Sequence, residues 1–307
     1  MGMDADNKPA VRLGLRPVIV GEVLFDCFDD GREVLGGAPF NVAWHLQAFG
    51  LAPLLISRVG DDPRGQRIRE AMQAWGMDLS GLQLDDTHPT GVVAITMQGQ
   101  QHTFNILPDQ AYDHLDPSQA LSHPIWPEAG MWYSGSLIER SASARQTIAA
   151  LRRRNLPHFM DINLREPWWQ REAVLAMLQG VNWAKLNDQE LHALGYHAEP
   201  SQAVAQLRRE HDLDWVILTQ GEQGALLYDG EGILSGTPVP VGQMVDTVGA
   251  GDAFSAVMIL GLMRGWPKRV TLQRALAFAS AQCEVQGAIR EERAWYQRVM
   301  ASWEESE

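Results

Sequence analysis

The chain has 307 residues, of which 45% are hydrophobic and 21% are charged. These proportions are ordinary for one large globular domain, or for one domain with a small appendage. Lysine and arginine number 25 against 38 aspartate and glutamate residues, a formal net charge of −13, which argues against a nucleic-acid or anionic-membrane surface, because both are bound mainly through Lys and Arg.

The amino-terminal segment, MGMDADNKPAVRLGLRP, lacks the apolar stretch of a secretory signal. No apolar run in the sequence approaches the roughly 20 residues that a membrane-spanning helix needs. The two cysteines, Cys27 and Cys283, lie far apart without CxxC spacing, so we expect neither a disulfide scaffold nor a zinc site of cysteines. We therefore expect a soluble, cytoplasmic protein.

Short apolar runs alternate with helical patterns along most of the chain. The runs predict strands at 18–25, 54–60, 131–136, 157–163, 181–187 and 215–221. The helical patterns fall at 38–49, 62–75, 141–154, 170–180, 200–210 and 252–264. Such alternation is typical of βαβ units, and it predicts an α/β fold with a mainly parallel sheet covered by helices on both faces.

Residues 91–107, GVVAITMQGQQHTFNIL, interrupt this rhythm with two strand-like halves around Gln98–Gly99–Gln100. The pattern predicts a hairpin, which together with about 26–36 would form a small β lid beside the main sheet. The alternative is an edge hairpin without a function. We expect a single α/β domain over 1–307, with the lid built from about 26–36 and 91–107.

Polar residues follow almost every predicted strand. These polar exits are Asp26, Ser134–Gly135–Ser136, Asp161 with Asn163 and Arg165, Asn187–Glu190, and Thr219–Gln220–Gly221. In open α/β sheets, ligands bind beyond the carboxyl ends of the strands. Any one exit is explained by an ordinary loop, but the set indicates a ligand crevice along one edge of the sheet.

The segment DTVGAGDAF, Asp246 to Phe254, is the sharpest local feature. A turn of small residues, Gly249–Ala250–Gly251, leads into a strongly apolar helix. The free N–H groups of such a helix start, together with the helix dipole, can hold the negative charge of a phosphoryl group in transfer. Asp252 lies at the start of the helix, where its carboxylate could take a proton from an attacking hydroxyl. The alternative is that Asp252 only caps the helix.

A second glycine-rich segment, GGAPFN, precedes the first predicted helix. Gly36 and Gly37 allow close backbone approach to a ligand, and Asn41 offers a donor and an acceptor to a polyol. A plain loop before a helix is the alternative. The sequence contains no GxxxxGK[ST] and no HRD or DFG set, which excludes a P-loop enzyme and a protein kinase. GAGDAF lacks the third glycine of GxGxxG, which disfavours a dehydrogenase.

These two segments, in this order, resemble the two signatures of the PfkB, or ribokinase-like, carbohydrate kinase family. GGAPFNVAWHLQAFG resembles the first signature and DTVGAGDAFSAVMI the second. Between them, DINLREPWW resembles the DPNLR segment of bacterial fructokinases and 2-keto-3-deoxygluconate kinases, and NDQE matches the family's NxxE motif. The likeness covers about 18–290 and is closest in motif to bacterial fructokinases. It implies a ribokinase-like fold and transfer of the γ-phosphoryl group of ATP to a sugar hydroxyl.

The resemblance also implies roles for individual residues. Asp252 would be the catalytic base, Gly249, Ala250 and Gly251 the anion hole, and Arg165 a cation near the sugar or the phosphoryl group. Sugar binding would fall to Asp26, Gly36, Gly37, Asn41 and Asn163. Nucleotide binding would fall to Asn187, Thr219, Gly221, Gly224 and Ser280. Glu190 and Asn187 would help to hold Mg²⁺, largely through water, and Asp246 with the Val248 backbone corresponds to a monovalent-cation (K⁺) site of many family members.

The sequence departs from the family pattern in two places. No arginine occurs from His102 to Leu115, where relatives that bind acidic substrates often carry one, so a neutral sugar such as fructose is favoured. Ser280 stands where the family often has Asn near the adenine. The alternatives are a kinase for ribose or 2-keto-3-deoxygluconate, or a non-catalytic sugar- or nucleotide-binding regulator with the same fold. We expect no nucleic-acid or membrane partner, and a homodimer is the oligomer that an exposed lid sheet would favour.

Overall fold

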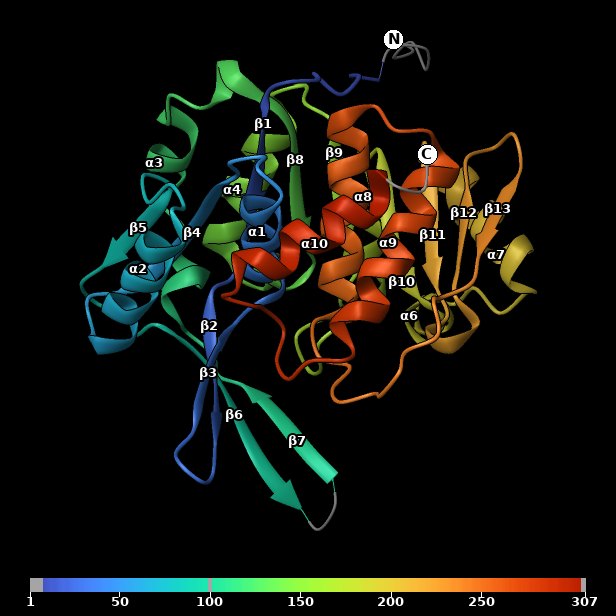
Figure 1. The fold of residues 1–307 in the computed structure, drawn as a ribbon. Helices are drawn as coiled ribbons and strands as arrows, with labels where there is room; N and C mark the ends of the chain where they lie inside the picture. The colour runs from blue at the N-terminus through green and yellow to red at the C-terminus, as the bar shows by residue number, and fades with distance from the viewer. Residues whose placement is uncertain (1–7, 99–100, 305–307) are drawn as a thin grey trace, which may run out of the picture.

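The computed structural model describes residues 8–98 and 101–304. Within them, the chain forms a nine-stranded sheet flanked by helices and a separate four-stranded sheet that projects from one end (Figure 1). None of the helices in this part of the chain combines the length and apolar character that crossing a bilayer requires.

The nine-stranded sheet has the order β13-β12-β11-β10-β9-β8-β1-β4-β5. Neighbouring strands are parallel from β5 to β11, while β12 and β13 join antiparallel at one edge. The parallel part confirms the prediction, and the antiparallel edge is an addition to it. The strands are β1 (Arg16–Val20), β4 (Leu54–Gly60), β5 (Leu82–Asp85), β8 (Ala129–Gly135), β9 (His158–Asp161), β10 (Trp183–Asn187), β11 (Trp215–Thr219), β12 (Ala225–Tyr228) and β13 (Ile233–Gly236).

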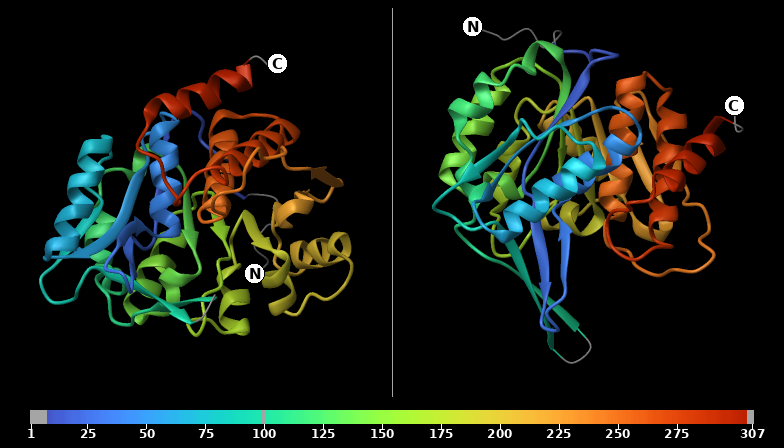
Figure 2. Two further views of the ribbon diagram at one scale, coloured as in Figure 1. Left: turned by 60° about the horizontal axis from the view of Figure 1, so that its bottom comes forward. Right: turned by 60° about the vertical axis from the view of Figure 1, so that its left-hand side comes forward.

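Helices cover both faces of this sheet, as predicted (Figure 2). Side chains alternate between the faces along each strand. Ile19 belongs to the core cluster that includes α1, α2, α8, α9 and α10, whereas Val18 and Val20 belong to the cluster that includes α3 and α4. The remaining helices, α5 to α7, cover β9 to β11 on this second face. The α-helices are α1 (Ala38–Ala48), α2 (Pro63–Trp75), α3 (Pro117–Ser122), α4 (Ala142–Arg152), α5 (Arg171–Met177), α6 (Asp188–Ala193), α7 (Pro200–Glu210), α8 (Ala250–Arg264), α9 (Lys268–Gln282) and α10 (Arg293–Glu304), and the 3₁₀ helices are η1 (Ala111–His114), η2 (Trp126–Glu128), η3 (Leu137–Arg140) and η4 (Gly221–Gln223).

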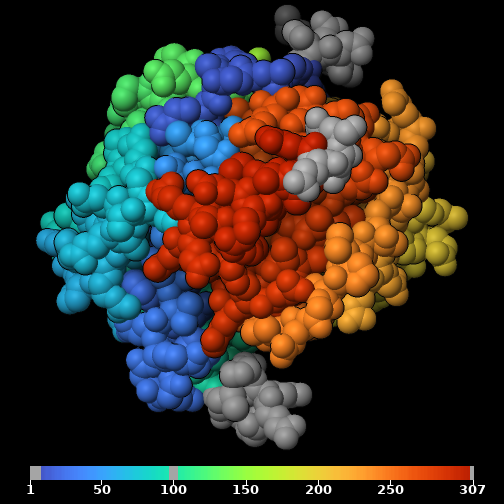
Figure 3. Space-filling view, viewed as in Figure 1, coloured from blue at the N-terminus to red at the C-terminus, as the bar shows by residue number. Residues whose placement is uncertain are grey.

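The four-stranded sheet has the order β3-β2-β6-β7 and consists of β2 (Leu24–Phe28), β3 (Glu33–Gly36), β6 (Gly91–Gln98) and β7 (Gln101–Ile106). Strands β6 and β7 pair antiparallel, so the predicted hairpin is present, although Gly99 and Gln100 of its turn lie outside the described residues. In the space-filling view, the blue residues of β2 and β3 project below the helices that cover the main sheet (Figure 3).

One strand prediction is wrong. Residues 18–25 do not form a single strand, because β1 ends at Val20 and β2 starts at Leu24 in the other sheet. The chain crosses between the sheets at Gly21, where a Cβ would come within 2.2 Å of Pro39 Cγ, so only glycine fits there. The apolar run is continuous because residues on both sides of this crossing are buried.

Candidate active site

A cavity of about 1030 Å³ lies between the carboxyl edge of the main sheet and the four-stranded sheet. Its lining residues come from the predicted strand exits, from the amino-terminal ends of α1 and α8, and from the inner side of the four-stranded sheet. They include Asp26, Gly36, Gly37, Asn41, Asn163, Arg165, Asn187, Glu190, Thr219, Asp246, Gly249, Gly251 and Asp252. Most of the residues predicted to form a site therefore meet in this one crevice.

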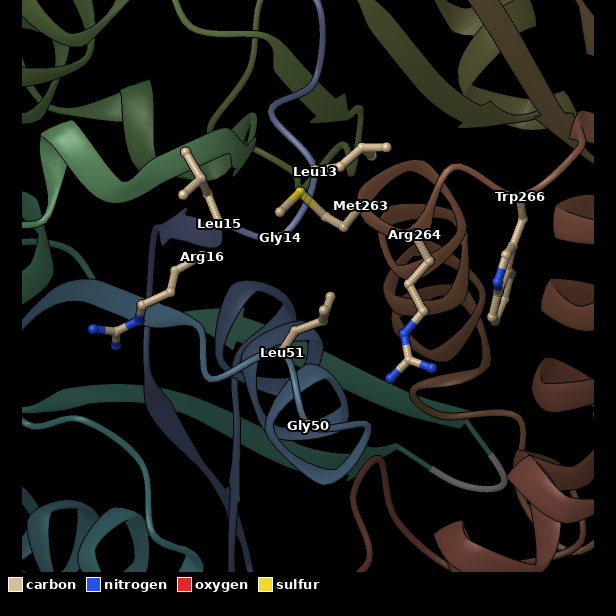
Figure 4. A pocket seen from close by; sticks show the side chains of 9 residues that line it. All are labelled: Leu13, Gly14, Leu15, Arg16, Gly50, Leu51, Met263, Arg264 and Trp266. Atoms are coloured by element: carbon tan, nitrogen blue, oxygen red, sulfur yellow. The ribbon is translucent and has the colours of Figure 1, made fainter.

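A smaller cavity of about 530 Å³ lies at the opposite ends of α1 and α8 (Figure 4). Gly50, just past α1, and Arg264, the last residue of α8, line it together with apolar side chains such as Leu51 and Met263. Its lining residues include no carboxylate and none of the predicted site residues. The predicted site residues therefore gather in the larger crevice, not in this cavity.

Asp252 lies beside the early glycine-rich segment. Asn41 Nδ2 donates a hydrogen bond of 2.7 Å to Asp252 Oδ2, which joins the first turn of α1 to the first turn of α8 across 211 residues of sequence. Gly249 caps α8 with a φ of 79°, and a Cβ there would come within 2.5 Å of Ala288 Cα. Only glycine fits this turn, and the free N–H groups of the helix start follow it directly.

The surroundings of Asp252 suit a proton acceptor. Burial raises the pKa of Asp252 to about 6, the hydrogen bond from Asn41 opposes this rise, and the neighbouring Asp161 adds to it. Lys185 and Arg165 lower the pKa. A carboxylate with such a pKa is ionised at neutral pH and is a better base than an exposed aspartate.

A buried network supports the start of α8 from the main sheet. Lys185 Nζ donates to both carboxylate oxygens of Asp161, at 3.0 and 2.9 Å, and to the carbonyl oxygen of Gly251 at 3.3 Å. Ser255 Oγ donates to Asp161 Oδ2 at 2.8 Å and to the Gly251 carbonyl at 3.0 Å. Lys185 also lines the crevice. This lysine is not among the residues predicted from the sequence, although it is the single charged residue inside the apolar run VNWAKLN.

The NDQE segment forms the cap of α6. Asn187 Oδ1 accepts from the Glu190 N–H and Glu190 Oε2 accepts from the Asn187 N–H, both at 2.9 Å, while Glu190 Oε1 accepts from the Leu164 N–H at 3.0 Å. These reciprocal bonds are a capping box. Burial raises the pKa of Glu190 to about 7, and the charge of Asp161 adds to this rise. Both residues line the crevice, so the cap also presents polar groups to a ligand.

Two more carboxyl groups, Asp26 and Glu22, line the crevice. Burial raises the pKa of Asp26 to about 6 and that of Glu22 to about 7, and the charge of Arg165 lowers both. Glu22 is buried and lines the crevice, and its Oε2 has no hydrogen-bond partner among the residues that the structure describes. A Cβ on Gly37 would come within 2.7 Å of the Glu22 carbonyl oxygen. Glu22 is also absent from the predicted site residues, although a charged residue within the apolar run VIVGEVLF is a signal that the sequence displays.

Four predicted site residues do not line the crevice: Ala250, Gly221, Gly224 and Ser280. A Cβ on Gly224 would come within 2.0 Å of the Gly236 carbonyl oxygen, so this glycine is required for the turn between β11 and β12. Ser280 is buried within α9. Asp246 does line the crevice, and it fixes two loops, because its carboxylate oxygens accept from the N–H groups of Val248 and Gly287, each at 3.0 Å.

Comparison with known proteins defines the class of this chain. Residues 28–294 match the model of the pfkB family carbohydrate kinases. The chain is 29% identical to the fructokinase of Escherichia coli over 261 residues, covering 80% of this chain and 83% of the relative. It is 27% identical to the 5-dehydro-2-deoxygluconokinase of Geobacillus thermodenitrificans over 263 residues, covering 81% and 78%. The crystal structure of the ATP-bound fructokinase from Xylella fastidiosa superposes with a TM-score of 0.82 at 20% identity, covering 95% of this chain and 99% of that one.

The match over most of the chain and the shared fold define the class as carbohydrate kinase. The chain belongs to the pfkB family, and it is a sugar phosphotransferase. The family resemblance read from the four sequence motifs and the ribokinase-like fold expected from it are both confirmed.

Proposed function

We propose that this protein is an ATP-dependent fructokinase, which transfers the γ-phosphoryl group of ATP to a hydroxyl of fructose. The observation that carries the proposal is the 2.7 Å contact between Asn41 and Asp252 inside the crevice. Through this contact, the side-chain amide of Asn41, which can bind a polyol, lies next to the carboxylate of Asp252, which can accept a proton. Asp252 also lies at the start of a helix, where free N–H groups attract anions. The fructokinase of E. coli among the relatives supports the choice of sugar.

In the proposed reaction, Asp252 accepts the proton of the attacking sugar hydroxyl, and Asn41 holds the carboxylate in place. The backbone amides of Gly249, Ala250 and Gly251 stabilise the negative charge on the phosphoryl oxygens during transfer. Arg165 adds a fixed positive charge from the other side of the crevice. Asp26, Gly36, Gly37 and Asn163 bind the sugar. Asn187, Thr219, Gly221, Gly224 and Ser280 serve the nucleotide, the last three from outside the lining of the crevice.

The residues around Glu190 fit a Mg²⁺–ATP complex. Its buried carboxyl group and the Asn187 side chain line the crevice next to Asp161, and carboxylate and amide oxygens are the ligand types that Mg²⁺ prefers. Since backbone N–H groups occupy both oxygens of Glu190, we propose that these residues act on the ion through water. When bound, Mg²⁺ neutralises phosphate charge. Asp246 is the proposed carboxylate of a K⁺ site, because each of its oxygens accepts one N–H and retains a lone pair.

The four-stranded sheet is the proposed lid. Phe104 of β7 lines the crevice and is 58% exposed, so movement of this sheet toward the main sheet would cover the side chain and exclude water from the reaction. The same exposed sheet is the surface that we propose for a homodimer.

A second substrate class is favoured by one observation. Arg32 and Arg165 both line the crevice, which would suit the carboxylate of a sugar acid, and one relative is a 5-dehydro-2-deoxygluconokinase. Against it, Arg32 is paired with Asp30 at 3.3 Å, and the described β7 lining residues Thr103, Phe104 and Ile106 carry no charge.

A coupled ADP-release assay tests the proposal across fructose, ribose, 2-keto-3-deoxygluconate, 5-dehydro-2-deoxygluconate and adenosine. The highest kcat/KM is expected with fructose. A higher value with either sugar acid would transfer the assignment to a sugar-acid kinase. Absence of ADP release with every acceptor, together with sugar binding by calorimetry, would favour a non-catalytic regulator.

A further inference from the structure

A cluster of three potential metal ligands lies outside the crevice, at the base of the four-stranded sheet. It consists of His88, Asp109 and His114. His88 lies three residues before β6 begins at Gly91, Asp109 lies three residues after β7 ends at Ile106, and His114 ends η1. The chain therefore enters and leaves the β6–β7 hairpin through this cluster.

The donor atoms already lie close together. His114 Nε2 is 2.7 Å and His88 Nε2 is 3.9 Å from Asp109 Oδ1, and one donor atom from each residue lies within 4.8 Å of the others. A tetrahedral zinc ion with bonds of about 2.0–2.1 Å separates its ligand atoms by about 3.3 Å. Shifts of about 1 Å or less in these partly exposed side chains would bring the donor atoms to that spacing.

A buried carboxylate orients one of the histidines. His88 Nδ1 lies 3.0 Å from Asp85 Oδ2, and Asp85 is 1% exposed and paired with Arg58 at 2.9 Å. The Asp85 carboxylate can only accept a hydrogen bond, so the ring proton of His88 is held on Nδ1. The lone pair of His88 then remains on Nε2, the nitrogen that faces Asp109. A carboxylate behind a ligating histidine is the usual supporting partner in metal sites.

We propose that His88, Asp109 and His114 bind one divalent transition-metal ion, with Zn²⁺ the ion best suited to two imidazoles and one carboxylate, and with water in the remaining position. The ion ties the two ends of the β6–β7 hairpin to each other. Arg58 connects this site to the main sheet. It belongs to β4, and its guanidinium contacts both Asp85 and the His114 carbonyl oxygen. The bound metal thus restricts movement of the hairpin at its base.

Binding requires one local rearrangement. The rings of His88 and His114 now stack face to face, with centroids 3.5 Å apart and planes 10° apart. For both Nε2 lone pairs to meet at one ion, the two rings must fan apart about their Cβ–Cγ bonds. The side chains are 24% and 34% exposed, so space for this movement lies on the solvent side.

The test is titration of Zn²⁺ into the chelator-treated full-length protein without nucleotide, followed by calorimetry, with Co²⁺ absorption as a second probe of coordination. We expect one equivalent of Zn²⁺ to bind. Co²⁺ bound at the same site should give the intense visible absorption of an ion with a low coordination number. His88→Ala and His114→Ala should each weaken binding at least about tenfold. Asp109→Asn should also weaken it, and this variant is the safest for folding because the Asp109 side chain is 73% exposed.

His192 and His197 supply a matched control. Their exposed rings also touch, at 4.2 Å between centroids, and within 8–98 and 101–304 they belong to no group of three potential ligands. A His192→Ala/His197→Ala variant should bind Zn²⁺ as the parent does. Hydrogen exchange of the β6 and β7 amides should slow when Zn²⁺ is added to the parent but not to His88→Ala. Unchanged affinity in the His88, Asp109 and His114 variants, or no binding by the parent, would overturn the proposal. Neither result depends on phosphoryl transfer, so the proposed kinase activity is tested separately.

Discussion

At the scale of single residues, Asp252 lies beside Asn41 in the crevice with a pKa raised to about 6, which is the basis for its proposed role as the base. We predict that Asp252→Asn lowers kcat by about 10²–10⁴-fold, the range of general-base catalysis. Asparagine keeps the size of the side chain and removes its basicity, so sugar binding measured by calorimetry should persist. Turnover close to the parent rate would remove Asp252 from the mechanism.

The pH dependence of the reaction gives a second residue-scale prediction. The base must be ionised to act, and the pKa of Asp252 is raised to about 6, so kcat/KM should fall as the pH drops through about 6. Asn41 donates a hydrogen bond that lowers this pKa. In Asn41→Ala, the pKa should therefore rise, and the acidic limb of the profile should move to higher pH.

Other carboxyl groups of the crevice titrate in the same range, because the pKa values of Glu22 and Glu190 are raised to about 7. The Asn41 variant distinguishes the titration of Asp252 from that of Glu22 and Glu190, because Asn41 donates its hydrogen bond to Asp252. A profile that stays in place in Asn41→Ala, measured under saturating ATP, would assign the acidic limb to another group.

How far these residues could be predicted depends on what the sequence displays. Asp252 and Asn41 stand next to glycine-rich turns, whose requirement for bare backbone is visible in the sequence, and the structure brings both to one crevice. Glu22 and Lys185 lie inside apolar runs instead. Only the three-dimensional structure shows that these two residues line the crevice. Gly224 looks like a ligand-binding glycine in the sequence, and the structure adds a second requirement for glycine there, because a Cβ would collide with the Gly236 carbonyl oxygen.

At the scale of elements, the buried Lys185–Asp161 pair holds the start of α8 against β9 and β10. We predict that Lys185→Met lowers the free energy of unfolding by about 3–5 kcal/mol, because it leaves Asp161 buried without its charged partner. Urea denaturation measures this change. The proposed anion hole should also lose alignment, because the Gly251 carbonyl loses a donor. We therefore expect kcat to fall by a larger factor than the sugar KM rises.

A double variant distinguishes loss of the pair from loss of packing. Asp161→Asn added to Lys185→Met removes the uncompensated charge and should recover part of the lost stability. Asp30→Asn serves as a surface control, because both side chains of the Asp30–Arg32 pair are exposed. The unfolding midpoint of this variant should match that of the parent. Equal destabilisation in the single and double variants would mean that the charge of Asp161 is not the cause.

The arrangement of elements was predictable where hydrophobic periodicity is strong and unpredictable where two sheets meet. Strand β4 and helices such as α2 and α7 fall within a residue or two of the predicted ranges. Residues 18–25 were assigned to one strand because no polar residue except Glu22 marks the crossing at Gly21. The antiparallel edge was missed because β12 and β13 have only 4 residues each, too few for their apolar residues to show a strand pattern.

At the scale of the whole molecule, the crevice is shared by two sheets, so its chemistry depends on how they approach each other. Phe104 on β7 faces the crevice and is 58% exposed, whereas the next residue, Asn105, does not line it. If the four-stranded sheet closes over the sugar, Phe104 covers the reaction and excludes water, which otherwise competes for the phosphoryl group.

We therefore predict that Phe104→Ala raises the KM for the sugar and increases the fraction of ATP that is hydrolysed without sugar phosphorylation. ADP and sugar phosphate measured in the same reaction give this fraction directly. Asn105→Ala, on the same strand with its side chain on the other face, should leave both quantities unchanged. If Phe104→Ala gives the same ratio of ADP to sugar phosphate as the parent, this side chain does not exclude water. The lid proposed for the four-stranded sheet would then have to act through other residues that line the crevice, such as Ile95 or Ile106.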